Sequence, residues 1–386
     1  MRHIAPWFRR VATYTAWPQM PRAHGPFGKG ALSAAERARL AGLGLFINVQ
    51  TPAAIRAAHA LGGRALSYLS FYDTYVHTEG FESGTARVPW DGRTAQILLL
   101  DARGRFVNTP MDETWRMWRY LVCNNTREYV ERALAMVRRQ MEAGADGLFV
   151  DNSGRRMPCY GHGVPVGYSR KYRGVCTAMP RYDETDLTAG APPEELYAGG
   201  KRPVIPASNP EIGNLPVHRH IYPGKSHLYA YRQLLRKVRR VVRGYGRDKV
   251  IVVNGAAMAE EADAVMAESY ICSWTWTDRK ANRKELAAKW APYIASGRKV
   301  LALSYVGHTR WGDVEDALYC YAAAMLSDFM WSDYGTGTGK VCARLRKLNL
   351  GRRLTEPTAA GEVESAWFEN GLAAVNDGRR RRVLWV

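Results

Sequence analysis

The chain has 386 residues, of which 46% are hydrophobic and 24% are charged, a composition typical of globular proteins that excludes a wholly disordered chain. This length suits one barrel of about 250 residues with insertions, or two ordinary domains, and no apolar run approaches the ~18 residues of a membrane span. The 55 Lys and Arg residues against 36 Asp and Glu residues give a net charge of +19, which attracts polyanions unless it merely reflects a genome rich in Arg codons.

The first half of the chain predicts alternating strands and helices after an irregular leading segment. Residues 1–40 are interrupted by Pro and Gly and show weak periodicity. Continuous apolar runs then predict buried parallel strands, and apolar residues at helical spacing predict helices that begin at the capping residues Thr51 and Thr126. The expected strands are residues 43–50, 64–73, 95–101 and 146–152, and the expected helices are residues 52–61 and 126–144.

The second half begins with a long insertion. Residues 153–226 have poor periodicity, and structureless stretches of that length are uncommon unless they are functional. The alternation then resumes with strands expected at residues 250–254, 263–268, 299–306 and 330–333, and helices at 227–244, 284–297 and 313–330. Eight strand–helix units predict a (β/α)8 TIM barrel rather than a doubly wound sheet, because no GxGxxG follows the first strand.

The tail predicts a separate β element. Residues 365–376 and 379–386 are strand-like, and Asp377-Gly378 between them is a strong signal for a two-residue hairpin turn. We therefore expect a catalytic barrel over residues 1–340 and a small C-terminal β segment over residues 341–386.

Two carboxylates follow buried strands. Asp151 comes after Gly-Leu-Phe-Val, and Glu268 comes after Ala-Val-Met-Ala. Active sites of such barrels lie at the carboxyl ends of the strands, where the ionisation of a carboxylate can be tuned. A pair there suits glycoside hydrolysis, in which one group protonates the leaving oxygen and the other attacks the anomeric carbon or activates water. The alternative is structural: Asp151 caps a turn and Glu268 pairs with an Arg.

Other polar and aromatic residues at predicted strand ends are candidates for binding a sugar. Aromatic rings stack on sugar rings, and Tyr and Trp also offer a polar edge, although packing explains most aromatic residues of the chain. The predicted substrate-binding residues are Tyr72, Asp73, Asn152, Asn254, Trp274, Trp276, Tyr305, His308, Arg310, Trp311 and Asp333.

We expect neither a metal ion nor a cofactor. The set Cys159, His162, Cys176, His218 and His220 suggests zinc, but its spacing matches no defensible zinc site. Cys159 and Cys176 either form a disulfide within the insertion or remain free thiols.

The basic charge has two candidate locations. Residues 232–249 hold eight Lys or Arg and one acidic residue, and we favour a solvated outer helix over a polyanion-binding one because no nucleic-acid module accompanies it. If the charge serves function, we expect the cations of residues 155–225 to surround the barrel mouth.

Three short motifs resemble those of several TIM-barrel glycoside hydrolase-like families. The run from Ala143 to Asn152, AGADGLFVDN, resembles their fourth-strand motif, which ends in an active-site aspartate. DAVMAES, from Asp263 to Ser269, is similar to their sixth-strand motif, and FENGLAAVN, from Phe368 to Asn376, is similar to the start of their C-terminal β segment. The resemblance implies a barrel glycosidase with Asp151 and Glu268 as its carboxylate pair, as in retaining α-galactosidase-like enzymes, whereas the long basic insertion departs from them.

These observations predict a glycoside hydrolase acting on a neutral or anionic poly- or oligosaccharide. The alternatives are an inactive barrel that binds acidic glycan or nucleic acid, and a polysaccharide lyase that uses Tyr305, His308 and Arg310. We expect a carbohydrate partner, no specific nucleic acid and no membrane, and leave the oligomeric state open. The N-terminus lacks the apolar core of a secretory signal, so we expect a soluble protein that is either intracellular or secreted by a signal absent from this sequence.

Overall fold

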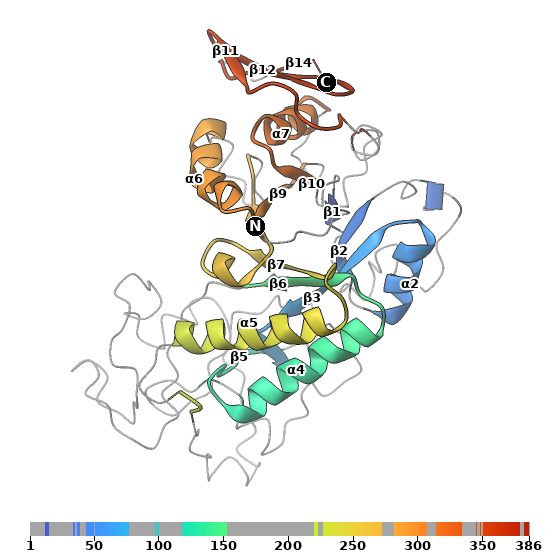
Figure 1. Ribbon diagram of the computed structural model, residues 1–386, viewed down its shortest axis with the longest axis vertical. Coiled ribbons are helices and arrows are strands. Elements are labelled where there is room, and N and C mark those ends of the chain that lie inside the picture. The colour runs from blue at the N-terminus through green and yellow to red at the C-terminus, as the bar shows by residue number, and fades with distance from the viewer. Residues whose placement is uncertain are drawn as a thin grey trace, which may run out of the picture. The chain divides into compact units, whose positions relative to one another are not determined.

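The computed structural model describes a little over half of the chain (Figure 1). Its described residues fall into two compact units, of which the first takes in 1–68, 140–149 and 242–386 and the second 69–139 and 150–241. We treat each unit by itself. The described residues are 12–14, 34, 37–38, 44–49, 51–76, 97, 99, 118–152, 220–222, 227–271, 282–306, 314–333, 345, 348, 350–378 and 382–385.

The first unit holds most of a closed ring of eight strands, of which only the last two residues of β3 and of β6 belong to the second unit. The strands follow one another around the ring in chain order, as the predicted (β/α)8 barrel requires. The pairs β1–β2, β2–β3, β7–β8, β8–β9, β9–β10 and β10–β1 are parallel. The strands are β1 (Ala12–Tyr14), β2 (Leu45–Val49), β3 (Arg64–Ser70), β6 (Gly147–Asp151), β7 (Val250–Asn254), β8 (Ala264–Glu268), β9 (Lys299–Ser304) and β10 (Met330–Asp333).

The predicted number of barrel strands is confirmed, but one predicted member is wrong. Residues 12–14, assigned to the irregular leading segment, form β1, which pairs with both β2 and β10. The expected strand at 95–101 is absent from the ring, and its described residues Ile97 and Leu99 are not in a strand. Strand β1 has only three residues, which is too short to show a recognisable apolar pattern. The apolar run at 95–101, in contrast, has the composition of a buried strand even though it does not join the ring.

The helices agree well with the predicted ones. Thr51 caps α2 with its hydroxyl 3.1 Å from the Ala54 N–H, and Pro52 occupies the first turn, as predicted. Between β7 and β8 there is a single 3-10 turn, η4 (Ala259–Glu261). The α-helices are α2 (Pro52–Ala60), α4 (Arg127–Glu142), α5 (His227–Gly244), α6 (Arg283–Ala295) and α7 (Val314–Leu326).

The barrel interior is filled by alternate residues of its strands. Because side chains of a strand alternate between its two faces, every second residue points inward. The resulting cluster is almost fully buried and comprises Leu45, Ile47, Leu66, Tyr68, Phe149, Val250, Val252, Ala264, Met266, Leu301, Leu303, Tyr305 and Met330.

A buried aspartate precedes β6 and ties three strands together at their amino ends. The Asp146 carboxylate accepts the Ala65 N–H at 3.0 Å and contacts Arg64 at 2.9 Å, His59 at 2.7 Å and Lys249 at 3.6 Å. Burial acts to raise the pKa of Asp146, but the hydrogen bonds from Ala65, His59 and Arg64 outweigh it and hold that pKa below its ordinary value.

The same arrangement recurs before β8. Asp263 accepts the Ile251 N–H at 2.9 Å through one carboxylate oxygen and pairs with Arg243 at 2.7 Å through the other. Its own N–H donates to the Ile251 carbonyl, just as the N–H of Asp146 donates to Ala65. The first aspartate of each barrel motif therefore stabilises the amino end of its strand, away from the end where barrel active sites lie.

The second unit contains an antiparallel ribbon that changes the expected position of Asp73. The predicted strand 64–73 ends at Ser70, and Asp73 is instead the first residue of β4 (Asp73–Val76), where it pairs with Leu121 of β5 (Trp118–Leu121). The premise that Asp73 ends a barrel strand is therefore wrong. The predicted cap of α4 is confirmed, since the Thr126 hydroxyl accepts the Tyr129 N–H at 3.4 Å.

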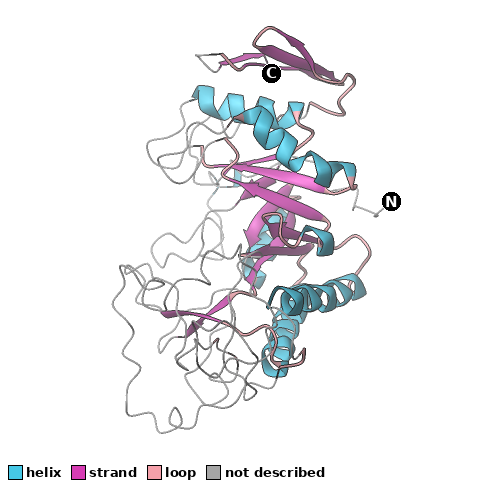
Figure 2. Cartoon of the chain, turned by 90° about the vertical axis from the view of Figure 1, so that its left-hand side faces the viewer, coloured by secondary structure: helices cyan, strands magenta, loops and turns pink. Residues whose placement is uncertain are grey.

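A sheet of its own lies beside the C-terminus of the chain (Figure 2). Its strand order is β11 (Thr358–Ala360), β12 (Val363–Phe368), β13 (Gly371–Asn376) and β14 (Arg382–Trp385). The expected single strand over 365–376 is wrong, because the chain reverses between Phe368 and Gly371, which pair. The predicted two-residue turn at Asp377-Gly378 is also wrong, because β13 ends at Asn376 and β14 begins at Arg382. The Asp377 side chain instead accepts hydrogen bonds from Arg283 of α6.

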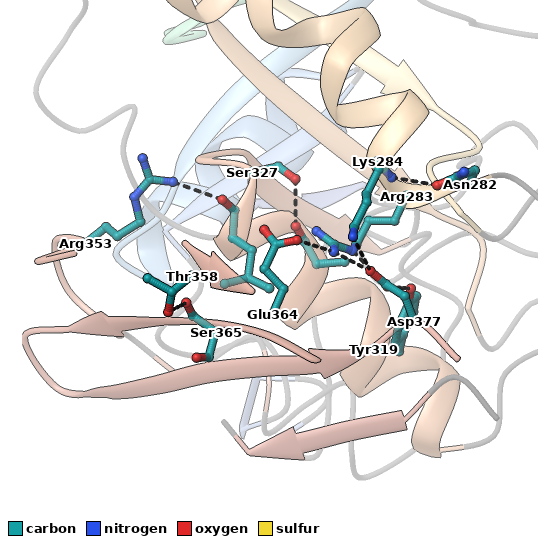
Figure 3. Close-up of polar contacts among 12 residues, drawn as sticks. Asn282, Arg283, Lys284, Tyr319, Ser327, Arg353, Thr358, Glu364, Ser365 and Asp377 are labelled. Atoms are coloured by element: carbon teal, nitrogen blue, oxygen red, sulfur yellow. Dashed lines mark hydrogen bonds and ion pairs between the residues drawn. The ribbon is translucent and has the colours of Figure 1, made fainter. Parts of the chain in front are cut away.

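Arg283, at the start of α6, fastens this sheet to the helices of the first unit (Figure 3). Its guanidinium is 2.6 Å from Asp377 and 2.7 Å from Glu364 of β12, and only 4% of the Arg283 side chain is exposed. Tyr319 of α7 donates to the same Asp377 carboxylate at 2.7 Å. Burial acts to raise the pKa of Asp377, but the bonds from Arg283 and Tyr319 hold it below its ordinary value. Placing a domain boundary at residue 340 stays a prediction.

Candidate active site

Glu268 is the last residue of β8 and is held by side chains from the strands on both sides. Asn254, the last residue of β7, donates its amide to Oε2 at 2.6 Å, and the Tyr305 hydroxyl, just past β9, donates to Oε1 at 2.5 Å. The Tyr305 ring belongs to the buried barrel core, whereas Glu268 is exposed. Three neighbouring strands thus present one accessible carboxyl in a fixed orientation, able to exchange a proton with a bound molecule.

The backbone after Glu268 is held in an unfavourable conformation. Ser269 has a φ of 60° and Ile271 a φ of 65°, in the left-handed region that β-branched residues essentially avoid. Such conformations cost on the order of 1–3 kcal/mol each and cluster at functional sites. No sequence pattern marks these two residues, so neither is predicted from the sequence.

Asn48 is a polar residue near the end of the first predicted strand that was not included among the predicted site residues. It lies within β2 with a φ of 68° and is 1% exposed. The pairing of β2 with β3 shifts register between Ile47 and Val49, which marks a β-bulge at Asn48. Bulges re-aim side chains beside active sites, and an Asn within an apolar strand is the signal that could have indicated one.

Asp151 is the last residue of β6 and is half-buried. Its Oδ1 accepts the backbone N–H of Asn152 at 2.7 Å, and the Asn152 side-chain amide lies 3.4 Å from Oδ2. Asn152 has a φ of 52°, a conformation that Asn tolerates better than most residues. Both predicted carboxylates therefore end barrel strands, and their pairing stays a prediction.

Four further predicted site residues lie among the residues that the structure describes. Asn254 and Tyr305 contact Glu268, as described above, so their first identifiable role is to hold that carboxyl. Tyr72 is buried, with 4% of the residue exposed, and Asp333 is the last residue of β10. The predicted residues that lie outside the described part of the chain are Trp274, Trp276, His308, Arg310 and Trp311.

The Cys and His residues that were considered as zinc ligands, and set aside on their spacing, also lie mostly outside the described residues. His220 is described, and its Nε2 lies 3.2 Å from the sulfur of buried Cys123, whereas Cys159, His162, Cys176, His218 and the cations of residues 155–219 are not. Among the side chains that the structure describes, no three His, Cys, Asp or Glu gather as metal ligands would. No helix within the described ranges has both the length and the apolar character needed to cross a bilayer.

No protein-family model and no curated protein matches the chain. The solved structures that match the chain include several glycoside hydrolases at low identity. The glycoside hydrolase domain of PelA from Pseudomonas aeruginosa shares 13% identity over 85% of this chain and 95% of its own, with a TM-score of 0.44. An α-galactosidase from Thermus thermophilus shares 14% identity over 92% of this chain and 65% of its own, with a TM-score of 0.48.

A dextranase from Flavobacterium johnsoniae, complexed with glucose, shares 9% identity over 90% of this chain and 39% of its own, with a TM-score of 0.49. All three TM-scores are below 0.5, and all three identities are below 15%. The function proposed next therefore rests on the residues of the site.

Proposed function

We propose that the protein is a glycoside hydrolase that cleaves O-glycosidic bonds of a poly- or oligosaccharide with Glu268 and Asp151. The observation that carries the proposal is the fixed, exposed Glu268 carboxyl at the carboxyl end of β8, held by Asn254 and Tyr305. Fixing a reacting group before the substrate binds is how enzymes reduce the entropic part of a barrier.

In the proposed reaction, the Glu268 carboxyl donates a proton to the glycosidic oxygen as the bond between that oxygen and the anomeric carbon breaks. The Asp151 carboxylate attacks the anomeric carbon or takes a proton from an attacking water. In the first case, water attacks the glycosyl–Asp151 bond, releases the sugar and gives its proton to Glu268. In the second case, Asp151 passes its proton to solvent and Glu268 takes one up from solvent. Polar side chains at the strand ends, including Asn152 and Asp333, bind sugar hydroxyls.

A polysaccharide lyase is a weaker candidate. A lyase would use Tyr305 as a base that removes a proton from the substrate, but its hydroxyl donates to Glu268. The two reactions also leave different products, since hydrolysis gives only new reducing ends and elimination also gives an unsaturated sugar. A panel of polysaccharides assayed for both products distinguishes them.

The variants Glu268→Gln and Asp151→Asn test the proposal. Each conserves shape, so we expect an unchanged melting temperature and a loss of turnover of about 10²–10⁴-fold or more. Glu260→Gln is the matched control, because Glu260 is an exposed acid in the turn just before β8. Near-normal release of reducing ends by both site variants would overturn the assignment.

A further inference from the structure

Helix α5 concentrates positive charge to a degree that the other helices do not. Over His227–Gly244 it carries six Lys or Arg and no acidic residue. Helix α4 has four cations and three acids, α6 has three cations and one acid, and α7 has two acids and no cation. A composition that is merely rich in Arg would raise the positive charge of every helix alike, so the charge on α5 is a local feature.

The charge also occupies one face. At ~100° per residue, all six cations fall within the half of the helix centred on Tyr229, Arg236 and Arg240, which are exposed. Apolar side chains fill the opposite half and are at most 2% exposed: Ala230, Tyr231, Leu234, Leu235, Val238 and Val242. The apolar face is thus buried within the protein, and the face that remains accessible is the charged one.

A rigid aromatic group adjoins the beginning of this face. The backbone of Tyr222 is held by both polar atoms of the Asn125 side chain, at 2.9 and 3.1 Å. The Tyr222 ring packs edge-on against Tyr229 with centroids 5.5 Å apart, and Lys237 lies 5.7 Å from the Tyr222 ring centroid. Tyr229 is 38% exposed and presents a fixed ring beside the cations.

We propose that this outward face of α5 binds a polysaccharide that carries carboxylate groups. Arginine pairs its guanidinium fork with a carboxylate through two hydrogen bonds. Arg243 pairs with Asp263, and four of the other five cations are Arg. Arg236 and Arg240 lie one turn apart, about 6 Å along the axis, and can engage successive charged positions of one chain. Tyr229 offers a surface on which a sugar ring stacks.

The proposal rests on the proposed glycosidase function and narrows its substrate to an anionic glycan. A membrane is a poorer fit, because helices that lie on bilayers insert an apolar face, and the apolar face of α5 is already buried. A nucleic acid shares the negative charge and is kept as an outcome of the test.

The test compares two charge reversals in the full-length protein. Arg236→Glu with Arg240→Glu alters the face of α5, whereas Arg138→Glu with Arg139→Glu alters two exposed arginines of α4 and serves as the control. Binding of polygalacturonate is measured by calorimetry at low salt, with neutral dextran, double-stranded DNA and phosphatidylserine vesicles as the other probes. Because binding is measured without turnover, a failure here is distinct from a failure of the hydrolase assay.

We expect the wild-type protein to bind polygalacturonate in preference to all three other probes. The α5 reversal should weaken that binding about tenfold or more, and the α4 reversal should change it less than about twofold. Added salt should weaken wild-type binding and have less effect on the α5 variant. The proposal fails if polygalacturonate does not bind or if both reversals weaken binding equally. It also fails if DNA or vesicles bind more tightly than polygalacturonate.

Discussion

Both carboxyl oxygens of Glu268 have a protein donor, which distinguishes this side chain from an ordinary surface glutamate. Asn254 and Tyr305 reach it because of strand register. Asn254 pairs with Met266, two residues before Glu268, and Tyr305 lies two residues beyond Leu303, which pairs with Glu268. The stagger of neighbouring strands in the ring thus brings three strand ends to one carboxyl.

The substitution Tyr305→Phe tests whether this contact positions the acid. The ring stays in the barrel core, so we expect little change in stability. Without the hydroxyl, the Glu268 carboxyl loses one of the two hydrogen bonds that orient it, a contact worth about 0.5–1.5 kcal/mol. We expect kcat to fall about 2–10-fold with KM nearly unchanged, because Tyr305 acts through Glu268. Tyr293→Phe on α6 is the control. A rise in KM at constant kcat would instead assign Tyr305 to substrate binding.

At the scale of elements, the contact between α6 and the C-terminal sheet depends on one buried cation. We expect Arg283→Met to cost about 3–5 kcal/mol of unfolding free energy, because Asp377 and Glu364 lose the guanidinium that neutralises them. Lys284→Met is the control, since Lys284 is exposed and 3.9 Å from Asp377, and should cost less than about 1 kcal/mol. Denaturant unfolding and amide exchange in β12 measure both. Equal stabilities would show that the sheet is held by apolar packing alone.

The elements also show what sequence patterns can and cannot predict. The ring strands from β6 onward and α4 were predictable because buried strands and amphipathic helices leave long, regular patterns, as in residues 147–151 and 127–142. Strand β1 has three residues and exists because β2 and β10 pair with it, which is a long-range condition. Asp151 and Glu268 stood out as polar residues after apolar runs, and Asn48 interrupts such a run. The contacts of Glu268 depend on the register of neighbouring strands, which no local pattern encodes.

At the scale of the whole molecule, we expect acid to unfold this protein because a few buried carboxylates that are paired in the folded state become protonated. The pKa of Asp146 is lowered in the folded state. Its contribution to the free energy of unfolding is therefore complete above its unfolded pKa of about 3.9, and is lost as pH falls through the lower folded pKa. We expect Asp146→Asn to lose about 2 kcal/mol at neutral pH and the difference from wild type to shrink below about pH 4.

Thermal melts at a series of pH values measure that difference. Asp328→Asn is the control, because Asp328 is exposed and its φ of 55° suits Asn equally well. A difference that stays constant down to about pH 2 would rule out Asp146 as the titrating group. Added salt should stabilise both proteins in acid, since the net charge of +19 grows as carboxylates take up protons.

The ion pair between Arg283 and Asp377 joins positions 94 residues apart. Its two members must therefore be inherited together. A recombinant chain that joined this barrel to the tail of another protein would bury a guanidinium without a carboxylate, and the reverse exchange would leave two carboxylates without their cation. Productive crossovers in the intervening segment are consequently restricted to partners that already carry both residues, so barrel and tail should evolve as one unit.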